Sequence, residues 1–225
     1  MHPALRRSIA AALIALATIA IADAQNDQTL YIVSYVEAVP ASQRQVAAML
    51  RQLADASRAE GALRFEVLQQ TGAANQFLIL ETWKDQQALD RHASAAHSAT
   101  FRDAVAPLLA APVDARSCVA TMVAMSSGDR AGMYAVTHVD VPGTNRDEAI
   151  GLMRGLVEQG RKDAGNLRFD VVHQTARTNH FTVIAAWKDQ KSQDEHQLAA
   201  HTREFRRRIT PLLGALYDQR WYKPL

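Results

Sequence analysis

The pattern of apolar and polar positions changes its period several times along the chain, and these changes predict an order of strands and helices. Residues 30–37 alternate and are rich in Tyr, Ile and Val, which is typical of a strand. Residues 42–59 place apolar side chains three and four positions apart, which predicts a helix that ends at Gly61. Four further elements are predicted: strands at 63–71 and 76–83, a helix at 85–109 with a break between His92 and Ser98, and a strand at 116–125.

The chain contains this unit twice. Residues 61–109 align without a gap with residues 165–213, and 23 of the 49 aligned positions are identical. The first strand also recurs, because residues 31–37 match residues 134–140. The order β-α-β-β-α-β is that of a ferredoxin-like unit. We therefore expect an α+β protein with two tandem domains, whose sheets cover each other within one chain.

The boundaries of these domains follow from the repeat and from the sequence before it. Domain 1 is predicted over 29–126 and domain 2 over 132–225, with a Ser- and Gly-containing linker between them. Residues 1–24 have the pattern of a signal peptide: a basic start, an uncharged apolar stretch and a small-x-small site at Ala22–Ala24. We expect cleavage after Ala24 and a periplasmic or secreted protein, with an uncleaved anchor helix as the alternative.

Composition excludes several classes of function. The formal net charge is only +2, from 25 basic and 23 acidic residues, so no dense basic surface for nucleic acid is expected. A single cysteine, Cys118, rules out an intrachain disulfide framework and a zinc ribbon. No segment after the leader is apolar enough to cross a bilayer, so no membrane partner is expected after cleavage. The expected state is a monomer that acts as a pseudo-dimer, and further self-association is left open.

The strongest chemical motif has the same spacing in both copies. It consists of Trp83-x8-His92-x4-His97-x3-Phe101 and Trp187-x8-His196-x4-His201-x3-Phe205. With the glycine before the second strand and the Glu-x-Trp-Lys-Asp end of the third strand, it resembles the antibiotic biosynthesis monooxygenase (ABM) superfamily, especially its quinol-monooxygenase-like members. The resemblance covers both copies.

The resemblance implies a dimeric α/β barrel with a pocket between the sheet and the helices of each unit. It also implies oxidation of a small quinol or phenol by dioxygen without a cofactor or metal, so the expected partner is a small aromatic molecule. Two alternatives are kept: a non-catalytic module that binds a small hydrophobic ligand, and a haem-binding or haem-degrading protein. Haem ranks lower, because the first strand offers Ser34 or Thr137 where haem degraders of the superfamily use Asn.

The candidate site residues combine the motif with its aromatic neighbours. Histidine titrates near neutrality and tryptophan offers a flat apolar wall with one N–H donor, although both also serve in ordinary packing and capping. The catalytic candidates are Glu81, Trp83, His92, His97, Trp187, His196 and His201. The substrate-binding candidates are Tyr35, Phe77, Phe101, His138, His173, Phe181 and Phe205.

The two copies differ at positions where a site is expected. Glu81 corresponds to Ala185, and Tyr35 corresponds to His138, so the sites need not be equal. His92 and His97 are five residues apart, which puts them ~140° apart around a continuous helix. No metal site is expected on that basis, because a zinc pair on one helical face normally has i, i+4 spacing.

Overall fold

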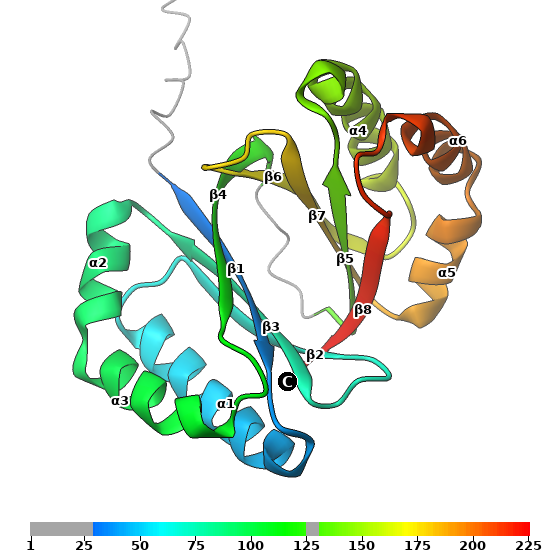
Figure 1. Ribbon diagram of the computed structural model, residues 1–225. Helices are drawn as coiled ribbons and strands as arrows, with labels where there is room; N and C mark the ends of the chain where they lie inside the picture. Colours follow the sequence, from blue (N-terminus) through cyan, green and yellow to red (C-terminus); the bar gives the residue numbers. More distant parts are fainter. Residues whose placement is uncertain (1–28, 125–130) are drawn as a thin grey trace, which may run out of the picture.

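The computed structural model describes residues 29–124, here called unit 1, and residues 131–225, here called unit 2. Both units have the same order of elements, and the second helical segment of each is split in two (Figure 1). Unit 1 consists of β1 (Leu30–Glu37), α1 (Gln43–Ala59), β2 (Arg64–Gln70), β3 (Gln76–Trp83), α2 (Gln86–Ser94), α3 (Ala96–Val105) and β4 (Asp114–Met122). Unit 2 consists of β5 (Met133–Asp140), α4 (Arg146–Gly160), β6 (Asn166–Gln174), β7 (His180–Trp187), α5 (Gln190–Leu198), α6 (Ala200–Ile209) and β8 (Asp218–Pro224).

The apolar spacing predicted two strands of unit 1 to the residue, and its last strand less well. β1 and β3 coincide with their predicted ranges. β4 begins at Asp114 and ends at Met122, two and three residues earlier than predicted. The strand β4 begins earlier than predicted because Asp114 still pairs with Tyr35 of β1.

One residue causes each helix break. Ala95 ends α2 and precedes α3 in an extended conformation, with φ −64° and ψ 146°. Its N–H still donates to the carbonyl of His92 at 3.1 Å, so the chain turns without losing that hydrogen bond. Ala199 has the same role in unit 2, with φ −63° and ψ 146°. The break predicted between His92 and Ser98 is thus confirmed, and it redirects the side chains on its two sides.

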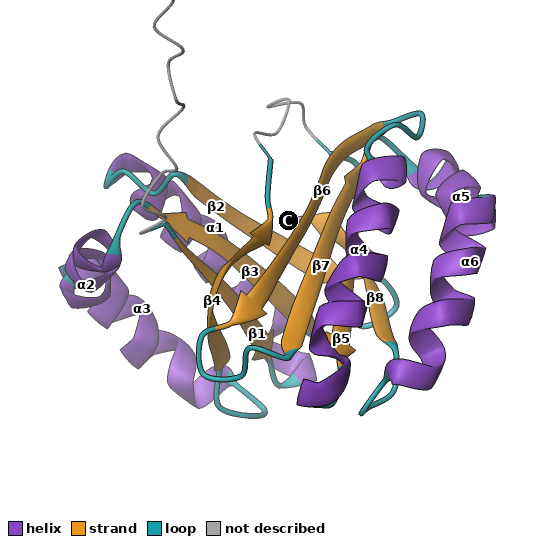
Figure 2. Ribbon diagram, turned by 90° about the horizontal axis from the view of Figure 1, so that it is seen from above, coloured by secondary structure: helices purple, strands orange, loops and turns teal. Residues whose placement is uncertain are grey.

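The two units close one eight-stranded barrel. The strand order is β1-β3-β2-β8-β5-β7-β6-β4, and every recorded pairing is antiparallel. β4 pairs with β1 of its own unit and with β6 of unit 2, while β8 pairs with β5 and with β2 of unit 1. The helices of the two units cover opposite sides of the barrel (Figures 1 and 2). This confirms the expected fold of two tandem ferredoxin-like units in an intramolecular dimeric α/β barrel.

Three apolar clusters follow from the alternation of side chains along the strands. One lies between the sheet and the helices of unit 1 and contains the fully buried Trp83, and its counterpart in unit 2 contains Trp187. The third fills the barrel interior with side chains from both units, among them Leu78, Ile184 and Tyr222. Cys118 belongs to this interior cluster and is completely buried, which raises the pKa of its thiol to about 12.

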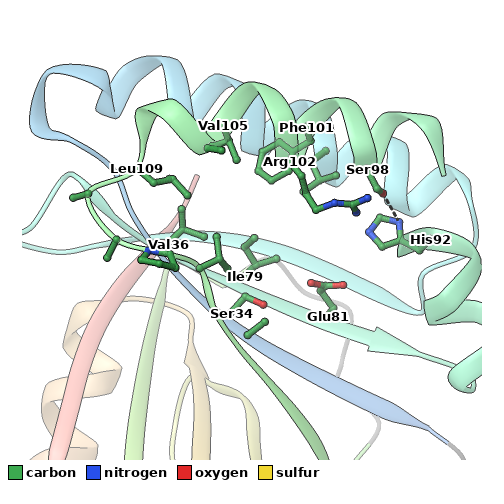
Figure 3. A pocket seen from close by; sticks show the side chains of 17 residues that line it. Ser34, Val36, Ile79, Glu81, His92, Ser98, Phe101, Arg102, Val105 and Leu109 are labelled. Carbon is green, nitrogen blue, oxygen red and sulfur yellow. Dashed lines mark hydrogen bonds between the residues drawn. The ribbon is translucent and has the colours of Figure 1, made fainter. Parts of the chain in front are cut away.

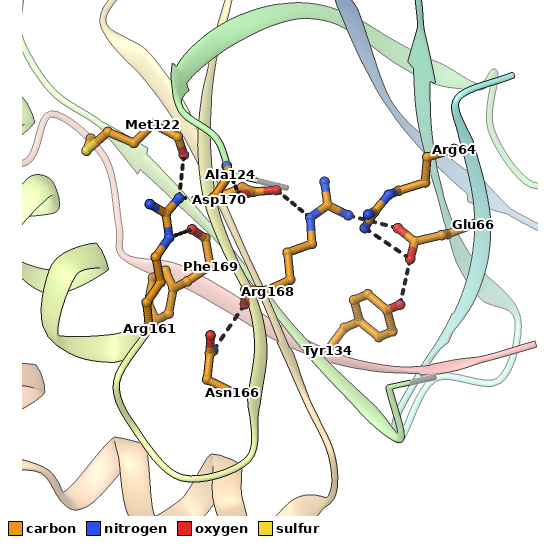
Figure 4. Close-up of polar contacts among 10 residues, drawn as sticks. All are labelled: Arg64, Glu66, Met122, Ala124, Tyr134, Arg161, Asn166, Arg168, Phe169 and Asp170. Carbon is orange, nitrogen blue, oxygen red and sulfur yellow. Dashed lines mark hydrogen bonds and ion pairs between the residues drawn. The ribbon is translucent and has the colours of Figure 1, made fainter. Parts of the chain in front are cut away.

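An ion network centred on the buried Arg168 connects the two units (Figure 4). Arg168 of β6 donates to Asp170 at 2.6 Å and, across the unit boundary, to Glu66 of β2 at 2.8 Å. Tyr134 of β5 donates to the second oxygen of Glu66 at 2.7 Å, and Arg64 lies 3.6 Å from it. The network therefore joins three strands of both units through a buried Arg168–Asp170 pair and a half-buried Glu66.

Four residue positions further along β5, a second polar cluster lies on the same inward face. The hydroxyl of Tyr35 donates to Nε2 of His138, and the guanidinium groups of Arg116 and Arg220 lie 4.8 and 5.8 Å from the Tyr35 ring centre. Tyr35 and His138 occupy matching positions of the two units, so this pair lies where the units face each other. Tyr35 and His138 do not line the spaces between the sheet and the helices, because Ser34 and Val36 are the β1 residues that face the helices. Tyr35 lines a separate cavity of about 160 Å³.

Two predictions about the ends of the domains lie outside this description. The expected signal peptide, residues 1–24, and most of the expected linker fall outside the described residues. Within residues 29–124 and 131–225, no helix combines the length and the apolar character needed to cross a membrane.

The buried network gives a stability prediction. Arg168→Ala leaves Glu66 and Asp170 without their shared cation, and breaking a buried ion pair in this way costs about 3–5 kcal/mol. Urea denaturation should show this loss in the free energy of unfolding. Arg207→Ala, which removes an exposed ion pair with Glu204, should cost less than about 1 kcal/mol. Equal losses in the two variants would show that the network does not stabilise the closed barrel.

Candidate active site

A large cavity opens between the sheet and the helices of unit 1 (Figure 3). Its volume is about 710 Å³, a size typical of small-molecule sites. Most of its wall is aliphatic or aromatic, so the few polar groups on it decide what orientation a ligand adopts. These polar side chains are Ser34, Glu81, His92, Ser98 and Arg102.

The floor of the cavity comes from alternate residues of two paired strands. Ser34 and Val36 of β1 and Ile79 and Glu81 of β3 face the helices, as Figure 3 shows for all four. Trp83 continues this face of β3 but lies deeper, with only 1% of its surface exposed. The period of two therefore places a carboxylate in the cavity and a tryptophan directly behind it.

The roof of the cavity is one face of α3. Ser98, Phe101, Arg102 and Val105 follow the spacing i, i+3, i+4, i+7, which aligns their side chains on one side of a helix. Nη1 of Arg102 donates to the carbonyl of Ala93 at 2.9 Å, so the end of α2 holds this cation at the cavity wall. Figure 3 shows Arg102 and Glu81 on opposite walls of the same space.

Glu81 has unusual acid–base properties for a carboxyl group. Burial raises its pKa to about 7, although the hydrogen bond from Trp83 partly opposes the shift. That hydrogen bond runs from Nε1 of Trp83 to Oε2 of Glu81 at 2.9 Å. A carboxyl with a pKa near neutrality can both accept and return a proton at physiological pH, which is the property a general base requires.

The two histidines of unit 1 play different parts. His92 lines the cavity, stacks on Trp83 with a centroid distance of 4.6 Å, and has Nδ1 3.1 Å from the Glu60 carboxylate. Burial lowers the pKa of His92, and Glu60 partly offsets this. His97 does not line the cavity, and its Nδ1 lies 3.3 Å from the same carboxylate. Glu60, His92 and His97 therefore form one cluster beside the cavity.

The equivalent space in unit 2 is closed. Its volume is about 10 Å³. Tyr217 and Gln219 occupy its wall at the positions of the smaller Val113 and Ala115 of unit 1. Arg206 donates to Gln219 at 3.0 Å, and Gln219 donates to Thr137 at 3.1 Å, which ties the helix to the floor of the space.

Unit 2 also lacks the acid–base pair. Ala185 stands where unit 1 has Glu81, and Nε1 of Trp187 has no hydrogen-bond partner among the described residues. Trp187 otherwise repeats the packing of Trp83, since it is fully buried and lies 4.7 Å from the His196 ring. The structure thus provides one equipped cavity, in unit 1, and a closed counterpart.

The structure separates the predicted site residues into four groups. Glu81, His92 and Phe101 line the open cavity, and Trp83 supports Glu81 from behind. Phe77, Phe181 and Phe205 are buried in the apolar clusters. His196 lines the closed space of unit 2 and lies beside Asp163. The others lie elsewhere: Tyr35 and His138 in the barrel interior, His97 beside Glu60, His173 against Thr121 and Phe181, His201 beside Asp163, and Trp187 in the core of unit 2.

Sequence reasoning missed three polar residues of the cavity: Ser34, Ser98 and Arg102. A signal was present in the repeat. Phe101-Arg102 recurs as Phe205-Arg206, and the hydroxyl of Ser98 recurs in Thr202. Together with Val105, these positions have the spacing of one helical face, which could have identified the roof of the pocket before the fold was known.

Comparison with known proteins agrees with this architecture. The sequence signature of the antibiotic biosynthesis monooxygenase (ABM) family matches residues 29–104 and 133–208, once in each unit. The chain belongs to the ABM family. A relative, "Putative monooxygenase YcnE" of Bacillus subtilis (strain 168), is 30% identical over 81 residues. These residues make up 36% of this chain and 85% of the relative.

Solved structures extend the likeness to the complete tandem barrel. The crystal structure of a "Putative monooxygenase (FN1347)" from Fusobacterium nucleatum subsp. nucleatum ATCC 25586 is similar, with a TM-score of 0.80 at 15% identity over 89% of this chain and 94% of the other chain. Another from Lactobacillus acidophilus NCFM has a TM-score of 0.74 at 10% identity, and covers 88% and 94%. At these identities the likeness shows the fold alone. The ABM barrel can therefore be built from one chain as a closed unit.

Exchanging the wall residues of the two units should exchange their cavities. Val113→Tyr with Ala115→Gln should fill the unit 1 cavity, and Tyr217→Val with Gln219→Ala should open the one in unit 2. Isothermal titration calorimetry with 2-naphthol should give one bound equivalent for the parent chain, none for the filled variant and two for the opened one. Binding that persists in the filled variant would place the ligand outside this cavity.

Proposed function

We propose that this ABM protein is a single-site monooxygenase that oxidises a small quinol or phenol with dioxygen in the cavity of unit 1. The observation that carries the proposal is Glu81, a carboxyl with a pKa of about 7 on the wall of an otherwise mainly apolar cavity. We further propose that the reaction needs no resident cofactor or metal, because an electron-rich phenolate can itself supply electrons to dioxygen.

Two side chains of the cavity serve the proton transfer that starts the reaction. Glu81 accepts the phenolic proton, and the nearby cation of Arg102 favours the resulting phenolate. The phenolate transfers electrons to dioxygen, and a C–O bond forms to give a hydroperoxide. The hydroperoxide loses water and leaves a carbonyl group on the ring, and the proton taken by Glu81 leaves with that water. The substrate thus loses two hydrogen atoms and gains one oxygen atom, and the second oxygen atom becomes water.

The apolar walls support this chemistry in two ways. They take up the ring of the substrate, and they keep water from Glu81, which strengthens the interaction of that carboxyl group with charge inside the site. Phe101 is the aromatic side chain placed to contact the ring from α3. Haem is supported less well, because Nδ1 of His92 is already engaged with Glu60 and Ser98.

Oxygen uptake with 1,4-dihydroxynaphthalene, corrected for uncatalysed oxidation, tests the proposal. Glu81→Gln should lower kcat/KM by about 10²–10⁴-fold, because the proton acceptor is lost while the shape of the cavity is kept. Glu148→Gln, on the exposed surface of α4, should leave the rate unchanged. In the parent, the rate should rise with pH through about 7 and level off, because only ionised Glu81 accepts the proton. Full activity of Glu81→Gln would overturn the proposal.

The tryptophans provide a matched pair that tests how Glu81 is tuned. Trp83→Phe removes the N–H that stabilises the ionised carboxylate, so the pKa of Glu81 should rise and the pH–rate profile should shift to higher pH. Trp187→Phe, which removes an N–H without a partner among the described residues, should not shift the profile. Saturable quenching of tryptophan fluorescence by the quinol without oxygen uptake would instead identify a binding module without catalysis.

A further inference from the structure

Two histidines and a carboxylate meet in each unit, and neither cluster is needed for the proposed reaction step at Glu81. In unit 2 they are Asp163, His196 and His201, and in unit 1 they are Glu60, His92 and His97. In both clusters, one potential ligand atom from each side chain lies within 4.8 Å of the other two. We propose that the Asp163–His196–His201 cluster is a zinc-binding site.

The helix break creates the geometry that the sequence did not predict. The expectation that the two histidines point to different sides of the helix assumed a continuous helix. The extended residue Ala199 separates α5 from α6, and the rings of His196 and His201 come to 5.5 Å between centroids. Asp163 approaches from the loop after α4, which packs beside α6 (Figure 1). Three different segments therefore supply the three side chains.

The distances fit a tetrahedral metal site that is contracted by hydrogen bonds. Nδ1 of His196 and Nε2 of His201 lie 2.7 and 3.0 Å from the same oxygen, Oδ2 of Asp163. Ligand atoms about 2.0–2.1 Å from a tetrahedral zinc ion are roughly 3.3 Å from one another, so small side-chain movements would admit the ion. Two imidazoles and a carboxylate are ligands that zinc uses with water in the fourth position.

The burial of the three side chains leaves one open side to the cluster. The hydroxyl of Thr202 lies 3.4 Å from Nδ1 and 3.3 Å from Nε2 of His196, so it does not select one of the two ring nitrogens as the metal ligand. The side chains of Asp163 and His201 are each 23% exposed, whereas His196 is 5% exposed. The ion would therefore reach a largely buried site from its open side.

The cluster of unit 1 is the internal comparison. There the two Nδ1 atoms contact different oxygens of Glu60, at 3.1 and 3.3 Å, and the Glu60 side chain is 36% exposed. The flexible glutamate and the wider spacing favour weaker binding than in unit 2. His180 provides a second comparison, because its Nδ1 lies 3.0 Å from Asp140 and the pair has no third potential ligand among the residues that the structure describes. It resembles the proposed site in its ion pair alone.

The proposal is tested by titrating the purified, chelator-treated full chain with Co²⁺ and Zn²⁺. Co²⁺ should develop the intense visible bands of a tetrahedral site, Zn²⁺ should displace it, and saturating Zn²⁺ should raise the Tm. His201→Ala and Asp163→Asn should each remove the tighter equivalent or weaken it at least tenfold. Asp163→Asn retains a hydrogen-bonding side chain, which guards against loss of fold, and circular dichroism checks both variants.

Two comparison variants show whether the tighter metal binding is specific to the Asp163–His196–His201 cluster. His180→Ala should leave the tighter equivalent unchanged, and so should His97→Ala. The proposal is overturned if Co²⁺ gives no tetrahedral spectrum, or if folded His201→Ala and Asp163→Asn bind as tightly as the parent. It is also overturned if His97→Ala alone removes the tighter equivalent. None of these results depends on oxygen uptake, so the failure of this proposal and the failure of the proposed function are distinguishable.

Discussion

The structure depends on the pairing of one edge strand of each unit with a strand of the other unit. β4 and β8 each pair with a strand of the other unit, and these pairings turn two open sheets into one closed barrel. Closure leaves no free strand edge within the barrel and buries the inward face of both sheets. It also buries Arg168, whose charge is compensated by Asp170 of its own strand and Glu66 of the other unit. Neither half could bury these groups in the same way by itself.

The same closure leaves the outward faces free to differ. Each unit packs its own helices on its own half of the barrel, so a change under α3 does not require a matching change under α6. Unit 1 has small residues at 113 and 115 and an open cavity, while Tyr217 and Gln219 fill the space in unit 2. The loss of Glu81's counterpart accompanies this filling. Unit 2 therefore keeps the packing of the family while it lacks the acid–base pair.

The sequence was sufficient for the fold and for part of the site. Period-two and helical patterns, read twice in an internal repeat, predicted the elements, the helix break and two tandem units, because each depends on local spacing and on burial of one face. The closed barrel was implied by the resemblance to the ABM superfamily. Glu81 followed from alternation along its strand, and His92 from the motif that carries the resemblance. Tyr35 and His138 were misplaced, since alternation shows which residues share a face but not which face meets the helices. The closeness of His92 and His97 depends on the torsion angles of Ala95, which apolar spacing does not reveal.

The covalent link between the units has a consequence for how the barrel behaves in dilute solution. In a barrel made of two separate chains, the β2–β8 and β4–β6 type pairings are intermolecular, so assembly follows the law of mass action. Here both pairings lie within one chain, and the effective concentration of one half around the other is set by the short connection between Met122 and Met133. Barrel closure within this chain therefore needs no encounter with a second chain.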